Sequence, residues 1–210
     1  MKKRRITLNK TNLSIVIPTY NERENISKIL GKLRKTLRNV KYEIIFVDDN
    51  SPDGTSDEVK AFMQKSPNIH LIHRIGRRGL SGAVIEGIFA SNSSLVGVMD
   101  CDLQHDESKL LDMLSLFKQN NSLDLVIGSR FTENGDITDG AFSKFREVGS
   151  KLITIIIKKI LNINSTDPLS GFFMVKKSSF LKYSKNLQTQ GFKVLADFLA
   201  VSGRAVEVKE

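Results

Sequence analysis

The sequence from residue 95 to residue 104 reads Leu95-Val96-Gly97-Val98-Met99-Asp100-Cys101-Asp102-Leu103-Gln104, an apolar segment that ends in an acidic one. The apolar part predicts a buried strand, and the acidic part is the loop after it. In open sheets of parallel strands, ligands bind beyond the carboxyl ends of the strands. This stretch therefore predicts an α/β fold with chemistry at one edge of the sheet.

The acidic loop itself suggests a metal site. If the backbone stays extended, Asp100, Asp102 and Gln104 project to one side and Cys101 to the other. Oxygen ligands of this kind suit Mg²⁺ or Mn²⁺. An isolated Asp-x-Asp is more often a solvated acidic turn, so both interpretations stay open here. The burial expected for Cys101 argues against a nucleophilic thiol.

Short β-rich runs alternate with amphipathic patterns on either side of this stretch. That alternation predicts a mostly parallel central sheet with helices on both faces. The expected strands are 13–17, 42–47, 69–73, 95–99 and 123–127, with a further one at 205–208. The expected helices lie near 26–37, 56–64, 79–90 and 108–118, with Asn21 and Glu24 capping the first and a Thr55/Glu58 capping box on the second.

The loops after the other strands are also rich in polar groups. Tyr20 could stack on a nucleobase, Glu22 could accept a hydrogen bond from a base or ribose, and either Asp48 or Asp49 could bind a ribose or base edge. Singly, these loops could equally be helix caps and turns. The segment 76–82 is basic and enters a helix, which predicts a phosphate-facing loop.

Composition sets the limits. At 210 residues and 40% hydrophobic positions, the chain fits a basic tail at 1–12 and a single domain at 13–210. One cysteine excludes an internal disulfide, and three histidines with that thiol do not make a usual zinc site. The net charge of +9 indicates an anionic partner.

No apolar segment follows the basic tail, so the tail is not a signal peptide; it is either solvated or a contact to anionic lipid headgroups. The apolar run 148–161 is too short to span a membrane and predicts a core helix, with an interfacial helix as the alternative.

Taken in order, the motifs resemble those of a known family. They are Ile17-Pro18-Thr19-Tyr20-Asn21-Glu22, Val47 to Thr55, Gly79-Leu80-Ser81-Gly82-Ala83, Asp100 to His105, Gly128-Ser129-Arg130-Phe131, Asp167 to Phe173 and Gln190-Gly191-Phe192-Lys193. In order and spacing they resemble the polyprenyl-phosphate sugar synthases of glycosyltransferase family 2, among which the dolichol-phosphate mannose synthases are most similar.

The resemblance implies a GT-A fold and an inverting, metal-assisted transfer, typically of mannose from GDP-mannose to a polyprenyl or dolichyl phosphate. It implies Mg²⁺ or Mn²⁺ as cofactor and a cytoplasmic protein that is peripheral at the membrane face. The roles it implies are nucleotide-sugar binding by Pro18, Tyr20, Glu22, Val47, Asp49, Asp100, Cys101, Arg130 and Lys193; metal binding by Asp100, Asp102 and Gln104; acceptor-phosphate binding by Arg130, Arg146 and Ser150; and catalysis by Asp102, Arg130 and Asp167.

Two departures bear on activity. Cys101 stands where relatives carry a small residue such as alanine, and relatives continue past 205–208 into a closing loop that is expected to be absent here. Two other functions stay open besides transfer to a lipid phosphate. One is transfer to a saccharide or other hydroxyl acceptor with Asp167 as base, and the other is that of a non-catalytic nucleotide-binding module. A nucleic-acid partner would rest on net charge alone, and no basic motif supports it.

Overall fold

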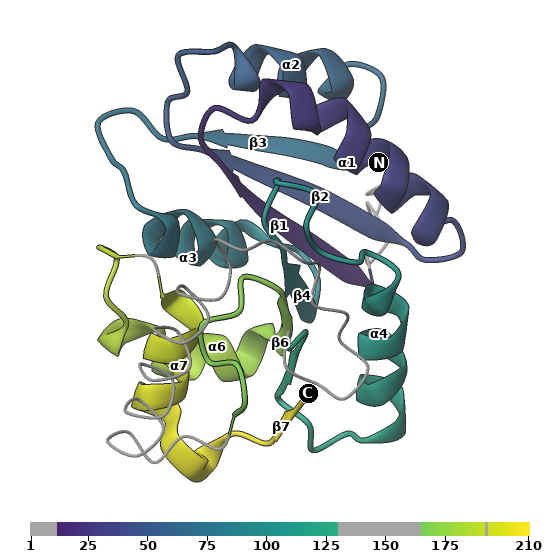
Figure 1. Cartoon of the computed structure of the whole chain (residues 1–210). Helices are drawn as coiled ribbons and strands as arrows, with labels where there is room; N and C mark the ends of the chain where they lie inside the picture. Colours follow the sequence, from purple (N-terminus) through teal and green to yellow (C-terminus); the bar gives the residue numbers. More distant parts are fainter. Residues whose placement is uncertain (1–11, 130–164, 192) are drawn as a thin grey trace, which may run out of the picture.

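The computed structural model describes residues 12–129, 165–191 and 193–210 (Figure 1). Its strands form one mixed sheet in the order β3-β2-β1-β4-β6-β5-β7. The strands are β1 Leu13–Thr19, β2 Tyr42–Asp48, β3 Ile69–His73, β4 Leu95–Val98, β5 Leu125–Ile127, β6 Phe173–Lys176 and β7 Val208–Lys209.

The first four strands are parallel to one another. β1 pairs with β2 over its whole length, from Leu13 opposite Tyr42 to Thr19 opposite Asp48. β4 pairs with the other side of β1, and β3 with the outer side of β2. β6 runs antiparallel between β4 and β5, so it alone joins the two parts of the sheet among the described strands.

Helices cover both faces of the sheet, and the alternation of side chains along β1 shows why. Leu13, Ile15 and Ile17 pack on one face, while Val16 packs on the other. The first face is covered by α1 Arg23–Thr36, α2 Thr55–Met63 and α4 Lys109–Gln119; the second by α3 Leu80–Ala90, α6 Lys177–Tyr183 and α7 Val194–Ser202. A short 3₁₀ turn at 184–186 follows α6, and another at 203–205 follows α7. Figure 1 shows α6 and α7 beside α3.

The order of the strands reverses at β1. The chain moves outward from β1 to β2 and β3 through helices on one face, then crosses to the other face through α3 and adds β4 on the opposite side of β1. Such a switch leaves a crevice beyond the carboxyl ends of the two strands. The loops that follow β1 and β4 therefore face each other.

The expected fold class is confirmed, and the expected strands 13–17, 42–47, 69–73, 95–99 and 123–127 are found within two residues of their predicted ends. Some local details differ from the predictions. β6 was not foreseen, and of the strand expected at 205–208 only Val208 lies in a strand, the two-residue β7, while Ala205 ends a 3₁₀ turn. Asn21 does not cap α1: it adopts a left-handed φ of 60°, and Glu22 is the residue that precedes the helix.

The start of α2 also differs from its predicted capping box. Gly54 occupies the cap position, and Asp53 accepts hydrogen bonds from the backbone and hydroxyl of Thr55. Burial would raise the pKa of Asp53, but these bonds, with one from the backbone of Arg23, outweigh it and lower the pKa. Asp53 thus ties the start of α2 to that of α1.

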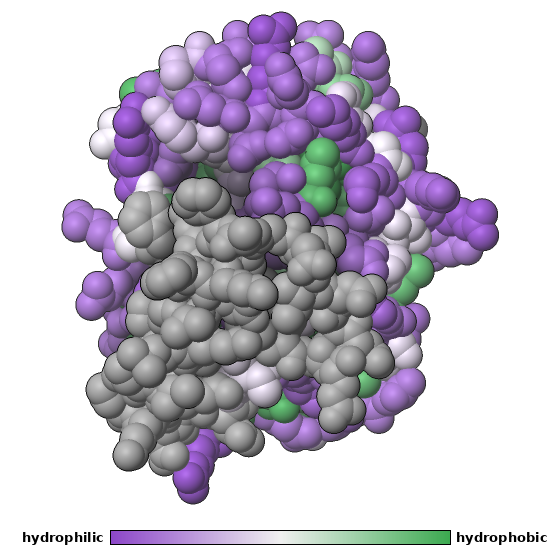
Figure 2. Space-filling view, viewed as in Figure 1, coloured by the Kyte–Doolittle hydropathy of each residue, from purple (hydrophilic) through white to green (hydrophobic). Residues whose placement is uncertain are grey.

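The surface of the described part is mainly polar over α1 and α2 (Figure 2). Across residues 12–129, 165–191 and 193–210, no helix is long and apolar enough to cross a membrane. The expected tail at 1–12, apart from Asn12, and the apolar run 148–161 lie outside the described residues.

Candidate active site

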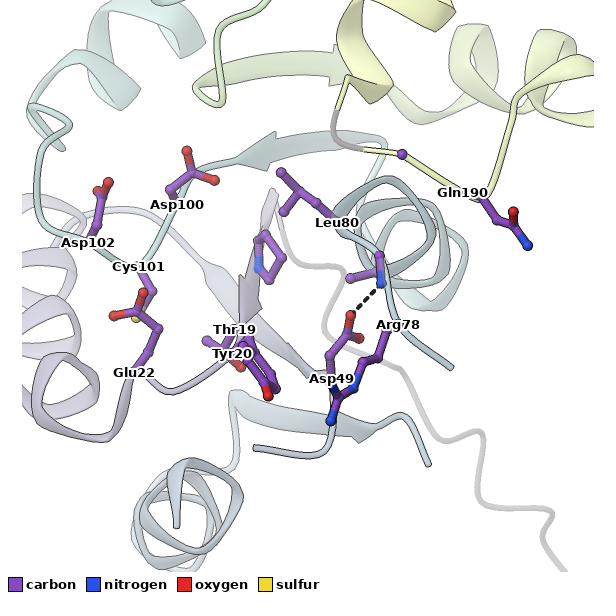
Figure 3. Close-up of a pocket in the computed structure, with 14 residues that line it drawn as sticks. Thr19, Tyr20, Glu22, Asp49, Arg78, Leu80, Asp100, Cys101, Asp102 and Gln190 are labelled. Atoms are coloured by element: carbon purple, nitrogen blue, oxygen red, sulfur yellow. Dashed lines mark hydrogen bonds between the residues drawn. The ribbon is translucent and has the colours of Figure 1, made fainter. Parts of the chain in front are cut away.

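A pocket of about 690 Å³ lies beyond the carboxyl ends of β1, β2 and β4. Its wall comes from the loops after these strands, from the start of α3 and from the segment before α7 (Figure 3). The lining residues at the ends of the strands and in the loops after them are Pro18, Thr19, Tyr20, Glu22, Asp49, Asp100, Cys101 and Asp102. The pocket therefore occupies the crevice that the strand order predicts.

The two aspartates at the carboxyl end of β2 have different environments. Asp48 is fully buried, and its carboxylate accepts hydrogen bonds from the hydroxyls of Thr19, Ser51 and Ser56 and from the backbone of Ser51. Four donors occupy the acceptor sites of a carboxylate. Asp48 thus organises the loop, and the geometry leaves Asp49 as the candidate ligand.

Asp49 lines the pocket and has partners of its own. Its Oδ1 accepts a hydrogen bond of 2.6 Å from Arg74 Nη1, and its Oδ2 accepts one of 2.8 Å from the backbone N–H of Gly79 (dashed in Figure 3). Gly79 directly precedes α3, where a negative charge is favoured by the helix dipole. Each oxygen keeps capacity for a further donor.

The amino end of α3 was expected to face phosphate, and much of its capacity is already used. Besides the Gly79 bond to Asp49, the N–H of Ser81 donates to the carbonyl of Gly191. Gly79 has a φ of 129°, which a residue with a side chain rarely adopts. Asp49 and the carbonyl of Gly191 thus each occupy one backbone donor at this end of the helix, and the phosphate-facing role of the loop stays a prediction.

Tyr20 stands at the mouth of the pocket. The residue is 45% exposed, and the guanidinium of Arg78 lies 5.0 Å from the ring centroid. An aromatic face beside a cation is a platform on which a planar ring can stack. Glu22, which is half-buried, accepts a hydrogen bond from Asn25 and lies on the same side of the pocket as Asp102 (Figure 3).

The acidic loop after β4 is not extended. β4 ends at Val98, and Leu103 has a left-handed φ of 65°, so the expectation that Asp100, Asp102 and Gln104 share one face is wrong. Asp100 and Asp102 line the pocket, whereas Gln104 is exposed and lies outside the lining. The backbone N–H of Gln104 donates to Asp102 Oδ1.

Two neighbours fix the carboxylate of Asp100. His105 Nε2 lies 3.3 Å from Asp100 Oδ2, and the imidazole stacks on Phe172 with 5.1 Å between ring centroids. Gly171 packs against the carboxylate so closely that a Cβ there would lie 2.1 Å from Oδ2. Absence of a side chain at 171 therefore creates the space that Asp100 occupies.

This donor set fits a hard divalent cation. Mg²⁺ is typically held in proteins by one or two carboxylates, with waters and substrate phosphates in the remaining positions. Asp100 and Asp102 supply two carboxylates at the pocket wall. Among the described residues, no cluster of three histidine, cysteine or acidic side chains forms a complete protein cage.

Cys101 is buried, as expected. Burial, with the nearby charges of Glu22, Asp102 and Asp100, raises the pKa of its thiol to about 12. A thiolate is the nucleophilic form of cysteine. The thiol is therefore unsuited to nucleophilic catalysis.

Several other predicted residues lie away from the pocket. Val47 is fully buried in the core against α3, Lys193 is exposed just before α7, and Asp167 is fully buried outside the pocket lining. Arg130, Arg146 and Ser150 lie outside the described residues. Of the predicted nucleotide-sugar ligands, the pocket gathers Pro18, Tyr20, Glu22, Asp49, Asp100 and Cys101.

Sequence reasoning did not assign three features of the site: Arg74, Gly171 and the pair Gln190 and Gly191 as pocket wall. An arginine directly after a strand is a usable signal for the first. The other two depend on segments that meet only in the folded chain.

The strand order and the pocket at the carboxyl ends place the protein among the Rossmann-like α/β domains. Comparison with known proteins narrows this class. Residues 14–184 match the model of glycosyl transferase family 2, and the chain belongs to that family.

Curated relatives and solved structures agree with this assignment. The chain is 35% identical over 200 residues to a dolichol-phosphate mannosyltransferase of Pyrococcus furiosus, covering 94% of this chain and 54% of that protein. It is 32% identical to the dolichol-phosphate mannosyltransferase of Saccharomyces cerevisiae, covering 89% of this chain and 69% of the relative. The chain therefore spans about half the length of the archaeal relative.

Solved glycosyltransferases share the fold. Glucosyl-3-phosphoglycerate synthase of Mycobacterium tuberculosis, in complex with Mn²⁺, UDP-glucose and phosphoglyceric acid, superposes with a TM-score of 0.67 at 17% identity, covering 95% of this chain and 69% of that one. Mannosyl-3-phosphoglycerate synthase of Rubrobacter xylanophilus gives 0.68 at 16% identity, covering 95% and 65%. The expected GT-A fold is thus confirmed.

Proposed function

We propose that the protein transfers a sugar, mannose from GDP-mannose, to a polyprenyl phosphate with inversion at the anomeric carbon. The observation that carries the proposal is the meeting of Tyr20 and Asp49 with Asp100 and Asp102 around one pocket. The first pair suits a nucleoside, and the second suits a metal-bound diphosphate. Kinship with the dolichol-phosphate mannosyltransferases supports mannose and a lipid phosphate.

In the proposed complex, the nucleobase stacks on Tyr20 and donates hydrogen bonds to Asp49. Asp100 and Asp102 hold Mg²⁺ or Mn²⁺, which when bound neutralises charge on the leaving diphosphate. His105 and Gly171 keep Asp100 in place for this. We extend the proposal by resemblance to Arg130, Arg146, Ser150 and Lys193 as phosphate contacts.

The proposed reaction does not require a strong base from the enzyme. A phosphate oxygen of the acceptor, ionised at neutral pH, attacks the anomeric carbon from the side opposite the diphosphate. The bond from that carbon to the diphosphate oxygen breaks, and its electron pair leaves with the nucleoside diphosphate. Alignment and charge compensation are the main contributions of the site.

A hydroxyl acceptor is less well supported. Such an acceptor must lose a proton, and Asp167, the candidate base, is fully buried and does not line the pocket. If Asp167 were that base, Asp167→Asn would nearly abolish transfer. A milder loss is expected under the lipid-phosphate proposal.

The test is a transfer assay with labelled GDP-mannose, Mn²⁺ and a polyprenyl phosphate. We expect an organic-extractable mannolipid from the wild type and strong loss in Asp102→Asn. Failure with GDP-, UDP- and other sugar donors alike would contradict the proposal. Nucleotide binding by calorimetry without turnover, even with membranes added, would indicate a non-catalytic binding module. Sedimentation with anionic vesicles tests the proposed peripheral membrane location.

A further inference from the structure

Arg74, directly after β3, is a buried cation that has no role in the mechanism above. The residue is 3% exposed and does not line the pocket. Its Nη1 donates to Asp49 Oδ1 at 2.6 Å and to the carbonyl of Gly79 at 3.1 Å. One nitrogen thus links the loop after β2 to the residue that precedes α3.

A second carboxylate completes the setting of Arg74. Its Nε lies 3.3 Å from Glu86 Oε1 in α3, at ion-pair distance but without hydrogen-bond geometry. The same Glu86 oxygen pairs with Arg77 Nη1 at 3.2 Å. A buried charge is tolerated only when it is well paired. The position of Arg74 is therefore fixed from two sides.

Glycine at 82 provides the room for the guanidinium. A Cβ at Gly82 would lie 2.6 Å from Arg74 Nη2 and 2.9 Å from the carbonyl oxygen of Thr189. Close by, the N–H of Ser81 donates to the carbonyl of Gly191. Arg74 thus lies beneath the first turn of α3, where the 189–191 segment that helps to line the pocket also packs.

We propose that Arg74 is a positioning residue, which holds the Asp49 carboxylate and the amino end of α3 in the arrangement that receives the nucleoside of the donor. The inference rests on the proposed function. Arg74 itself does not touch the ligand; it acts through Asp49. A carboxylate held in place before binding loses less freedom when a ligand arrives, which strengthens binding.

Arg74→Lys is the informative variant. Lysine keeps the charge, but its single ammonium cannot reproduce the planar fork that reaches Asp49, Gly79 and Glu86 together. Arg77→Lys is the matched control, because Arg77 shares the Glu86 partner and its side chain is 58% exposed. Each variant is titrated by calorimetry with GDP and, separately, with inorganic pyrophosphate, both in Mn²⁺.

We expect Arg74→Lys to weaken GDP binding by about tenfold, the effect of one well-placed charged hydrogen bond, and Arg77→Lys to change it by less than about twofold. Pyrophosphate affinity should stay within about twofold of the wild type in both variants, because Asp49 faces the nucleoside and not the diphosphate. General damage to the fold would weaken the binding of both ligands together.

Wild-type GDP affinity in Arg74→Lys, or equal losses for GDP and pyrophosphate, would overturn the inference while leaving the proposed function intact. If the wild type binds no nucleoside diphosphate, the proposed function fails and the inference with it. If Arg74→Lys does not fold, Glu86→Gln decides, since it removes the α3 carboxylate that pairs with Arg74; the pair with Arg77 that is lost with it is covered by the Arg77→Lys control. Glu86→Gln should weaken the binding of GDP and leave the binding of pyrophosphate unchanged. Any other pattern contradicts the role of Arg74.

Discussion

The α-carbon of Gly171 faces the Asp100 carboxylate so directly that an added Cβ would lie 2.1 Å from Oδ2. The residue belongs to the segment before β6, and Asp100 to the loop after β4. Two parts of the chain seventy residues apart are thus adjusted to each other at the proposed metal site.

Gly171→Ala should displace the Asp100 carboxylate. Misplacement of a reacting or ligating group by about 1 Å can cost about 10²-fold in rate, and we expect a loss of that order in transfer, with weaker Mn²⁺ binding by electron paramagnetic resonance. Gly31→Ala in α1 is the control, because its added Cβ would meet nothing within 4 Å apart from the adjoining residues and backbone of its own helix. It should stabilise the fold by about 0.5–1 kcal/mol with full activity. Unchanged Mn²⁺ affinity in Gly171→Ala would contradict the proposed metal site.

Asp48→Asn and Asp49→Asn should separate loop structure from ligand binding. Asp48 accepts four hydrogen bonds, from Thr19 in β1, from Ser51 in the loop and from Ser56 in α2, so its amide variant should lose about 1–3 kcal/mol of unfolding free energy in urea. Asp49→Asn should instead weaken GDP binding by about tenfold, as loss of a charged acceptor does. Equal effects of the two variants on GDP affinity would argue against Asp49 as the ligand.

Glu43 should make stability depend on pH. Burial raises its pKa, but hydrogen bonds from Ser14 and Asn92 and the charge of His70 outweigh this and lower the pKa below the ordinary 4.5. A carboxyl whose pKa is lower in the folded state stabilises the fold above its unfolded pKa, and that stability is lost as pH falls through the folded pKa.

The unfolding free energy of the wild type should therefore fall more steeply below pH 4.5 than that of Glu43→Gln, as measured in urea at stepped pH. Parallel pH profiles for the two proteins would show that Glu43 makes no such contribution. Lys60, in an exposed ion pair with Asp57, provides a control: Lys60→Gln should leave stability almost unchanged, because solvent screens the pair.

Cys101 should be unreactive in the folded protein. The residue is 2% exposed, and burial raises the pKa of its thiol to about 12. We expect almost no reaction with a thiol-directed chromogen at pH 8, and one equivalent after unfolding in urea. Rapid reaction without denaturant would show that the loop after β4 opens.

The elements whose partners are near in sequence were predictable from the residues. β1, β2 and β3 alternate with helices that pack on the sheet directly beside them, and their apolar periodicity shows this. β6 was missed because Phe173–Lys176 is a four-residue run whose partners, β4 and β5, lie far away in the chain. Nothing local distinguishes such a run from a loop.

The same distinction between local sequence signals and long-range contacts applies to the site. Tyr20, Asp49, Asp100 and Asp102 were found because each follows a strand, and the sheet gathers those ends. The extended backbone expected up to Gln104 failed at Leu103, whose positive φ is costly for a residue with a branched side chain and is not signalled by the sequence. Arg74 holds Asp49 and Gly171 holds Asp100 through tertiary contacts. The hydrophobic periodicity of the sequence carries no information about such contacts.

The place of β6 also bears on how the chain is made. The four parallel strands are complete once residue 98 has emerged from the ribosome, but among the described strands the free side of β4 finds its partner only in Phe173–Lys176. During that interval an unpaired strand edge is exposed, which is a hazard for association between nascent chains. We therefore expect slower synthesis between these points to lengthen the exposure of that edge.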